Sequence, residues 1–168
     1  MISRTAEYAV RAALWLVRHR GRPSTVREIA EDTAVPGGYL AKILRALGRA
    51  GLVRAQPGPG GGFLLSREPE AVSVLDVIDA ADPIHRVEGC PLGLPEHAET
   101  LCPFHARLDE ALAHTRNAFA NCTLAELIAE SDASGLFCSR TVGCGPGSQL
   151  SKSPCSNNCN SHVKGTQP

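Results

Sequence analysis

The stretch GLVRAQPGPGGGFLL, residues 51–65, decides the fold. Two short apolar runs, LVRA and GFLLS, flank residues 56–61, which are rich in glycine and proline and include no bulky side chain. Apolar runs on both sides of a glycine-rich turn are typical of a β-hairpin, whereas a flexible linker would not be bracketed in this way. We therefore predict a hairpin whose large tip can bring its backbone close to another molecule.

Three predicted helices precede the hairpin. Apolar residues recur at three- and four-residue spacing over residues 3–18, the pattern of a helix with one buried face, and Ser3 is a suitable N-cap. Thr25 and Glu28 have the spacing of a capping box at the start of the second helix. The turn VPGG at residues 35–38 ends that helix and leads into the third, which closes at Gly51.

The second and third helices with the hairpin behind them predict a winged helix-turn-helix, in which the later helix enters the major groove of DNA. Gly37 and Gly38 allow the positive end of that helix to approach a phosphate, although they can also serve only to form the turn. Tyr39 and Lys42 are one turn apart and are candidates for groove contacts, with partial burial as the alternative for Tyr39. The complete set of expected DNA-binding residues is Thr25, Gly37, Gly38, Tyr39, Lys42, Arg54, Gly58 and Gly60.

The formal net charge of zero conceals an asymmetry between the two parts of the chain. Residues 1–70 carry 11 Lys and Arg against 6 Asp and Glu, whereas residues 71–168 carry 6 against 11. A basic N-terminal part suits a polyanion such as double-stranded DNA, because phosphate neutralisation dominates affinity for nucleic acid. An Arg-rich solvated helix surface is the alternative interpretation of the same charges.

The second part of the chain predicts further helices. Residues 73–80 form a short helical pattern, and residues 101–121 form a longer one with Phe104, Leu108, Leu112 and Phe119 on one stripe. Little of the chain is left to cover so long a stripe, so we expect a homodimer, which also matches the two half-sites of an operator. Packing of this helix against the chain's own N-terminal domain is the alternative. The expected fold class is mainly α with a small β-hairpin wing and a long C-terminal dimerisation helix.

The loop before the long helix carries Cys90, His97, Cys102 and His105. Thiolate and imidazole groups are ligands of zinc and of iron–sulfur clusters, but the spacing is not that of a zinc finger. Metal or cluster binding, redox-active thiols and inert loop residues all remain open on the chemistry alone. Four further cysteines lie in a Ser-, Gly- and Asn-rich tail that we expect to be disordered, where they are either accidental or metal-binding; they are Cys138, Cys144, Cys155 and Cys159.

Residues 1–130 resemble the family of bacterial winged-helix iron–sulfur transcription regulators that includes IscR, NsrR and RirA. The motifs that carry the resemblance are the glycine-rich wing, VLDVIDA, the loop CPLG…CPFH, and TLAEL at residues 123–127. The resemblance implies a DNA-binding transcription regulator, a repressor, whose operator affinity is controlled by a cluster that senses redox, iron or nitric oxide status. A clusterless thiol-based redox regulator of the same fold and a metal-binding adaptor protein are the alternatives.

The resemblance also implies a set of ligands. The outer cysteines of the family's three-cysteine loop match Cys90 and Cys102, whereas the middle cysteine is replaced by His97. Glu7 matches a position in the first helix that supplies an acidic ligand from the partner subunit in some members. Two thiolates with nitrogen and oxygen ligands favour a 2Fe-2S cluster over a 4Fe-4S cluster. Pro57 stands where many relatives have an arginine, which leaves Arg54 as the nearest cation of the wing.

These observations predict an order of domains along the chain. We expect a winged-helix DNA-binding domain at residues 1–82, a cluster-binding loop at 83–103, the dimerisation helix and a short terminal helix at 104–133, and the tail at 134–168. The N-terminus is interrupted by charges where a signal peptide would be apolar, so we expect a cytoplasmic protein with no membrane partner. No nucleophile–base pair, paired carboxylates or phosphate-cradling loop is present in the sequence, which argues against an enzyme.

Overall fold

The computed structural model describes residues 2–90 and 101–134. His97 and the four tail cysteines therefore lie outside the described residues. The helices are α1 (Arg4–Arg18), α2 (Val26–Thr33), α3 (Gly37–Arg49), α4 (Val74–Ala81), α5 (Pro103–Ala120) and α6 (Leu124–Ser134), and the strands are β1 (Val53–Gln56) and β2 (Gly62–Leu65). None of the helices in this part of the chain is both long and apolar enough to span a bilayer.

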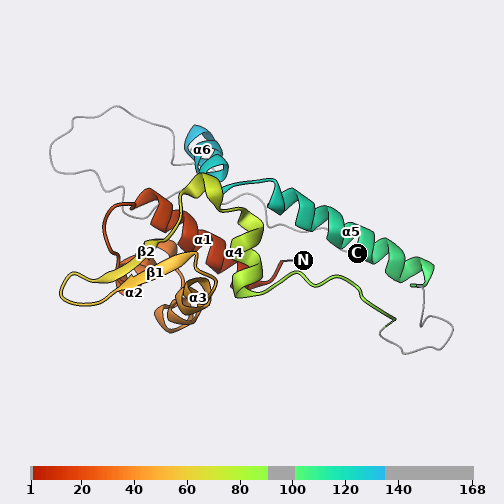
Figure 1. Cartoon of the computed structure of the whole chain (residues 1–168), viewed down its shortest axis with the longest axis horizontal. Helices are drawn as coiled ribbons and strands as arrows, with labels where there is room; N and C mark the ends of the chain where they lie inside the picture. Colours follow the sequence, from red (N-terminus) through yellow and green to blue (C-terminus); the bar gives the residue numbers. More distant parts are fainter. Residues whose placement is uncertain (1, 91–100, 135–168) are drawn as a thin grey trace, which may run out of the picture.

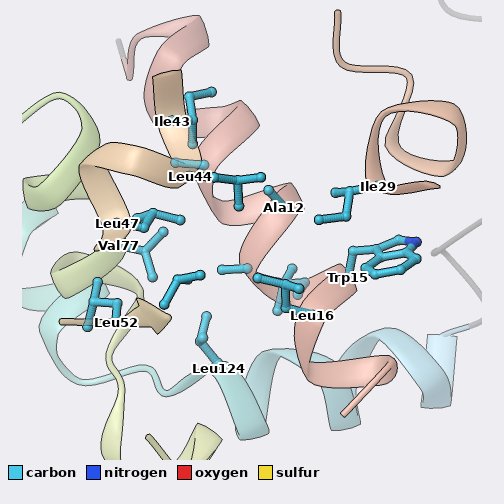
Figure 2. Packing of buried hydrophobic residues seen from close by; sticks show 14 of the residues in the cluster. Ala12, Trp15, Leu16, Ile29, Ile43, Leu44, Leu47, Leu52, Val77 and Leu124 are labelled. Carbon is cyan, nitrogen blue, oxygen red and sulfur yellow. The ribbon is translucent and has the colours of Figure 1, made fainter. Parts of the chain in front are cut away.

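Helix α1 lies at the centre of the core, in contact with α2, α3, α4, α6 and β2 (Figure 1). Its buried surface is wider than the single stripe predicted from sequence, because small alanines allow several elements to approach it. The buried residues of this helix are Ala6, Ala9, Ala12, Ala13, Leu14, Trp15 and Leu16. Figure 2 shows Leu16 and Ala12 among the side chains of α3, α4 and α6. Tight packing around α1 fixes the positions of the elements that surround it.

The helix-turn-helix and the hairpin form as predicted. Ala34 adopts a left-handed conformation with φ 55°, which ends α2 and redirects the chain into α3. Strands β1 and β2 pair antiparallel, with Val53 opposite Leu65 and Gln56 opposite Gly62. Ser24 bridges to Phe63 on the other edge of β2, which connects the hairpin to the loop between α1 and α2. A Cβ at Gly62 would overlap the Ser24 backbone, so this glycine is required by the close approach of the two segments.

Helix α6 returns to the core, a contact that sequence periodicity did not reveal. The backbone amide of Val74 donates to the carbonyl of Cys122 at 2.8 Å, and the amide of Leu124 donates to the carbonyl of Val72 at 2.9 Å. Leu124 is 0% exposed, and Figure 2 shows it beside the α1 and α4 side chains. The starts of α4 and α6 are therefore joined at the same face of α1. Cys122 is half-buried, and burial raises the pKa of its thiol.

Helix α5 contributes no buried residue over its whole length. It begins at Pro103, two residues later than the sequence pattern suggested, because proline suits the first turn of a helix. Phe104 is 69% exposed and Leu108 is 42% exposed, whereas Phe119, near the other end, packs against the core. Figure 1 shows α5 extending away from the end of the molecule that holds α2, α3 and the hairpin.

The capping box of α2 gives a pH dependence that can be tested. Backbone and side-chain hydrogen bonds from Thr25, with a further bond from Arg22, lower the pKa of Glu28 to about 2. This carboxylate therefore stabilises the fold above its ordinary pKa of about 4.5, and its contribution is lost as the pH falls from there towards 2. Glu28→Gln should flatten the acid dependence of the unfolding free energy in this range, measured by urea denaturation.

Two substitutions of Thr25 test the hydroxyl side of the same capping box by urea denaturation. Its hydroxyl accepts from the Glu28 amide at 3.2 Å, so Thr25→Ala should cost about 1 kcal/mol of stability, whereas Thr25→Ser should retain most of it. Parallel acid-denaturation curves for the wild type and Glu28→Gln would show that the carboxylate makes no such contribution.

Candidate nucleic-acid interface and ligand loop

The start of α3 is open to the exterior. No side chain caps this helix, and Gly37 and Gly38 are exposed. A Cβ built at either glycine would meet nothing within 4 Å, so packing within the described residues does not require glycine there. Because glycine has no side chain, the positive end of α3 is instead left accessible to an anion such as a phosphate.

One face of α3 carries a stripe of exposed cations. Lys42, Arg45 and Arg49 are all exposed, and none has an ion-pair partner in the described ranges. Their three- and four-residue spacing places them on the same side of the helix. Sequence reasoning selected Lys42 but omitted Arg45 from the expected contacts, although its spacing from Lys42 would have identified it.

Tyr39 connects α3 to α1. Its hydroxyl lies 2.5 Å from the Thr5 hydroxyl, and its ring meets Tyr8 edge-on, with the ring centroids 5.9 Å apart. The side chain nevertheless remains 40% exposed. Packing against α1 and exposure at the start of the recognition helix thus occur together, so the Thr5 contact can orient the ring for an external partner.

Thr25 lies at the exposed start of α2, where its hydroxyl also donates to the Glu28 carboxylate at 2.9 Å. The capping box therefore already engages the side chain that was expected to contact DNA. The backbone amide of Thr25 likewise donates to the Glu28 carboxylate, at 2.7 Å. Its role as a DNA contact stays a prediction.

The wing tip is exposed and built on glycines with positive φ. Gly58 has φ 103° and Gly60 has φ 74°, and the Gly61 amide donates to the Gly58 carbonyl at 2.9 Å. The glycines are thus needed for the turn itself, in addition to any approach to a groove. Arg54 is exposed but lies on β1, opposite Leu64, rather than at the tip.

The cysteine loop leads directly into α5. Cys90 and Cys102 are free, half-buried thiols, and Cys102 is the N-cap residue of α5. The Cys102 sulfur lies 3.2 Å from His105 Nδ1, so the thiol and the imidazole lie side by side at the start of α5. Within the described ranges, no three Cys, His, Asp or Glu side chains form a group that could hold a metal ion. Glu7 is exposed on α1 and lines a groove together with Phe119, which lies at the opposite end of α5 from Cys102.

Two arginine–aspartate pairs hold the segment after α4 against α5. Arg86 donates to both carboxylate oxygens of Asp109, and the Val87 amide donates to the same carboxylate at 3.0 Å. The Arg86 hydrogen bonds lower the pKa of Asp109, opposed by a smaller effect of desolvation. Arg116 donates to Asp79 of α4 at 2.8 and 2.9 Å, which joins α5 to the core. In Figure 1 this segment runs along α5 towards the Cys102 end.

Comparisons with known proteins agree with this geometry. A family model described as Rrf2, iron-dependent transcriptional regulator, matches residues 2–130. A protein of Aquifex aeolicus (strain VF5), named as a candidate HTH-type transcriptional regulator, is 31% identical over 131 residues, which span 76% of this chain and 91% of the relative. A similarly named protein of Azotobacter vinelandii, ORF2, is 32% identical over 130 residues, covering 77% of this chain and 79% of its own length.

Solved structures show the same fold. IscR of T. potens matches with a TM-score of 0.66 and 23% identity, over 80% of this chain and 90% of that protein. The global cysteine regulator CymR of B. subtilis matches with a TM-score of 0.64 and 24% identity, over 77% of this chain and 97% of that protein. The winged helix fold predicted from residues 51–65 is thereby confirmed. The chain belongs to the Rrf2 family and is a DNA-binding transcription regulator rather than an enzyme.

Proposed function

We propose that this regulator is a homodimeric repressor whose affinity for its operator is controlled by an iron–sulfur cluster in the loop at residues 83–103. The observation that carries the proposal is the placement of Cys90 and Cys102: both thiols are free, and the Arg86–Asp109 pair holds the chain shortly before Cys90 against α5, which starts after Cys102. The iron-dependent description of the family and the presence of IscR among the similar structures support it.

The donor chemistry fits such a group. Cys90 and Cys102 would supply thiolates to the cluster. The His105 imidazole lies next to the Cys102 sulfur, so it would reach the same ligand position in place of that sulfur. His97 is the expected third ligand of the loop. Glu7 lines a groove beside Phe119, at the opposite end of α5 from Cys102, so it would serve as a ligand only as the partner subunit's Glu7. This mixed set of sulfur, nitrogen and oxygen ligands favours a 2Fe-2S cluster over a 4Fe-4S cluster. When bound, the 2Fe-2S cluster would supply a centre that accepts or donates one electron.

The contacts of α5 suggest how the loop affects the DNA-binding elements. A change at the loop acts on Asp109 through Arg86, and α5 is joined to α4 by the Arg116–Asp79 pair. Helix α4 packs on both α1 and α3. In this mechanism α5 has two geometries, and the state of the loop decides which of them is more stable. A shift from one to the other would change the spacing or tilt of the two α3 helices of the dimer.

Removal of the cysteines tests the cluster. Anaerobically purified wild-type protein should show visible absorption, iron and acid-labile sulfide, and Cys90→Ser and Cys102→Ser should each lose all three. Cys122→Ser is the matched control, because Cys122 packs against the core at the start of α6 and should leave the spectrum unchanged. Unchanged iron and sulfide in both loop variants would exclude this cluster site.

A clusterless thiol regulator of the same fold is the second candidate. The free, partly exposed Cys90 and Cys102 thiols favour it, because exposure makes a thiol accessible to oxidants. Iron and sulfide counts on the anaerobic wild-type protein distinguish the two functions, since a thiol regulator would contain neither.

The homodimer is supported by the uncovered surface of α5. Phe104 and Leu108 are exposed on this helix, and an apolar groove of about 270 Å³ lies between α1, α4, α5 and α6. The groove is lined by Val10, Leu14, Ile78, Phe119 and Leu127, with Glu7 beside them. A second copy would cover apolar surface that the described chain leaves open.

Charges placed on α5 should separate the subunits. We expect the wild type to sediment as a dimer of 17.7 kDa chains and the double variant Phe104→Glu/Leu108→Glu to sediment as a monomer, because each carboxylate would be buried in the interface. Arg107→Glu, on an exposed position of the same helix, is the control for charge alone. A monomeric wild type, or a dimeric double variant, would contradict the role of α5.

A further inference from the structure

A cavity of about 360 Å³ lies beside the hairpin, and its lining includes no residue of α3. Three separate segments contribute arginines to its lining: the loop after α1 supplies Arg20 and Arg22, β1 supplies Arg54, and the segment after β2 supplies Arg67. Four guanidinium groups around one cavity repel one another, so their arrangement is electrostatically unfavourable unless anions balance the charge. The cavity is therefore a candidate anion site.

The four arginines differ in their partners. Arg20 forms an ion pair with Glu68, the acidic residue of the lining, and Arg22 pairs with Glu28 at 3.1 Å. Arg54 and Arg67 have no ion-pair partner within the residues that the structure describes. The positive charge of the cavity that is not neutralised thus belongs to Arg54 and Arg67.

The frame of the cavity is held by the fold. Ser24 is hydrogen-bonded to Phe63 in both directions, at 3.0 and 2.8 Å, which joins the loop after α1 to β2. The Ser66 amide donates to the Leu52 carbonyl at 2.9 Å, which holds the start of the segment that carries Arg67. The backbones that carry the arginines are therefore positioned before any ligand binds, which lowers the entropic cost of binding.

We propose that this cavity binds a phosphate-type oxyanion through Arg54 and Arg67. Guanidinium groups donate planar pairs of N–H bonds that match phosphate oxygens, and charge-assisted bonds of this kind are the strong ones. The oxyanion has two possible sources: a soluble phosphorylated compound, or a backbone phosphate of DNA that crosses the base of the wing. The site does not depend on the iron–sulfur proposal, because none of its residues belongs to the loop or to α5.

Two assays on the full-length protein test the site and separate the sources. The first is calorimetric titration of the DNA-free protein with pyrophosphate, comparing the wild type with Arg54→Gln/Arg67→Gln. The second is the salt dependence of binding to random duplex DNA for the same two proteins. Both arginines are exposed, so the double variant should fold normally, which its thermal unfolding curve checks, and Arg107→Gln on α5 controls for lost charge.

A soluble oxyanion predicts pyrophosphate binding that weakens about tenfold or more in the double variant, with an unchanged salt slope on DNA. A DNA phosphate predicts no pyrophosphate binding and a salt slope shallower by about 0.9 for each arginine that contacts a phosphate. Either result supports the oxyanion site. The proposal is overturned if the double variant matches the wild type in both assays.

Discussion

Replacing Lys42 and Arg45 together by alanine should weaken binding to duplex DNA at least about tenfold while leaving the free energy of unfolding nearly unchanged. Both side chains are exposed on one face of α3, and neither has an ion-pair partner in the described part of the chain. Their removal therefore costs the folded protein little. If each neutralises one phosphate, the slope of log affinity against log salt should become shallower by about 1.8 in total.

Fluorescence anisotropy with a labelled duplex, repeated over a range of salt concentrations, measures both quantities. The control is Arg107→Ala, which removes an exposed cation from α5, the helix that extends away from α3 in Figure 1. If the α3 double variant and Arg107→Ala bound DNA equally well, the exposed stripe of α3 would not be part of the interface.

Leu124→Ala should produce the largest loss of stability among these variants. Leu124 is fully buried between α1 and α4, although it lies more than forty residues along the chain from α4. Truncation removes apolar contacts and leaves a cavity, which typically costs about 2–5 kcal/mol. Such a loss would show that α6 belongs to the same cooperative core as the helix-turn-helix.

Urea denaturation at one fixed protein concentration measures this loss, because the proposed dimer would make stability depend on concentration. Val26→Ala at the start of α2 is the matched control, since its side chain is only half-buried and lies outside the proposed dimer surface, so it should lose far less. A cost for Leu124→Ala below about 1 kcal/mol would mean that the start of α6 adds little to the core.

Features encoded by short-range spacing could be predicted from the sequence. The capping box of Thr25 and Glu28, the end of the third helix at Gly51, which has φ 70°, and the short helix within residues 73–80 were all expected. Each depends on residues within one or two turns of each other, so local propensity is enough to identify it. The hairpin followed for the same reason, since its turn and strands are contiguous.

Features that join distant segments could not be predicted in this way. The Arg86–Asp109 pair links residues 23 apart, and the hydrogen bond between Thr5 and Tyr39 links residues 34 apart. Gly62 was expected at the start of the second strand of the hairpin, but the sequence did not indicate that its backbone lies against Ser24. Such contacts depend on how the elements pack, which periodicity does not specify. The assignments of His97 and of the tail cysteines concern residues outside the described ranges and stay predictions.

The candidate DNA interface includes both features that local spacing predicts and features that depend on how distant segments pack. Gly37, Gly38 and Lys42 were selected correctly as exposed residues at the start of α3, because helix phase alone determines which side they occupy. Arg54 was assigned to the wing as the cation nearest its tip, but its place on β1 also makes it part of the cavity beside the α1–α2 loop. Its contact with DNA stays a prediction.

The most direct test of the central claim is the binding of the purified, anaerobic protein to a random duplex at increasing salt concentration. We predict measurable affinity at low ionic strength and a slope of log affinity against log salt steeper than about −3, since the exposed cations of α3 and the wing should neutralise several phosphates. Absence of binding at low ionic strength, or an affinity that does not change with salt, would contradict the account.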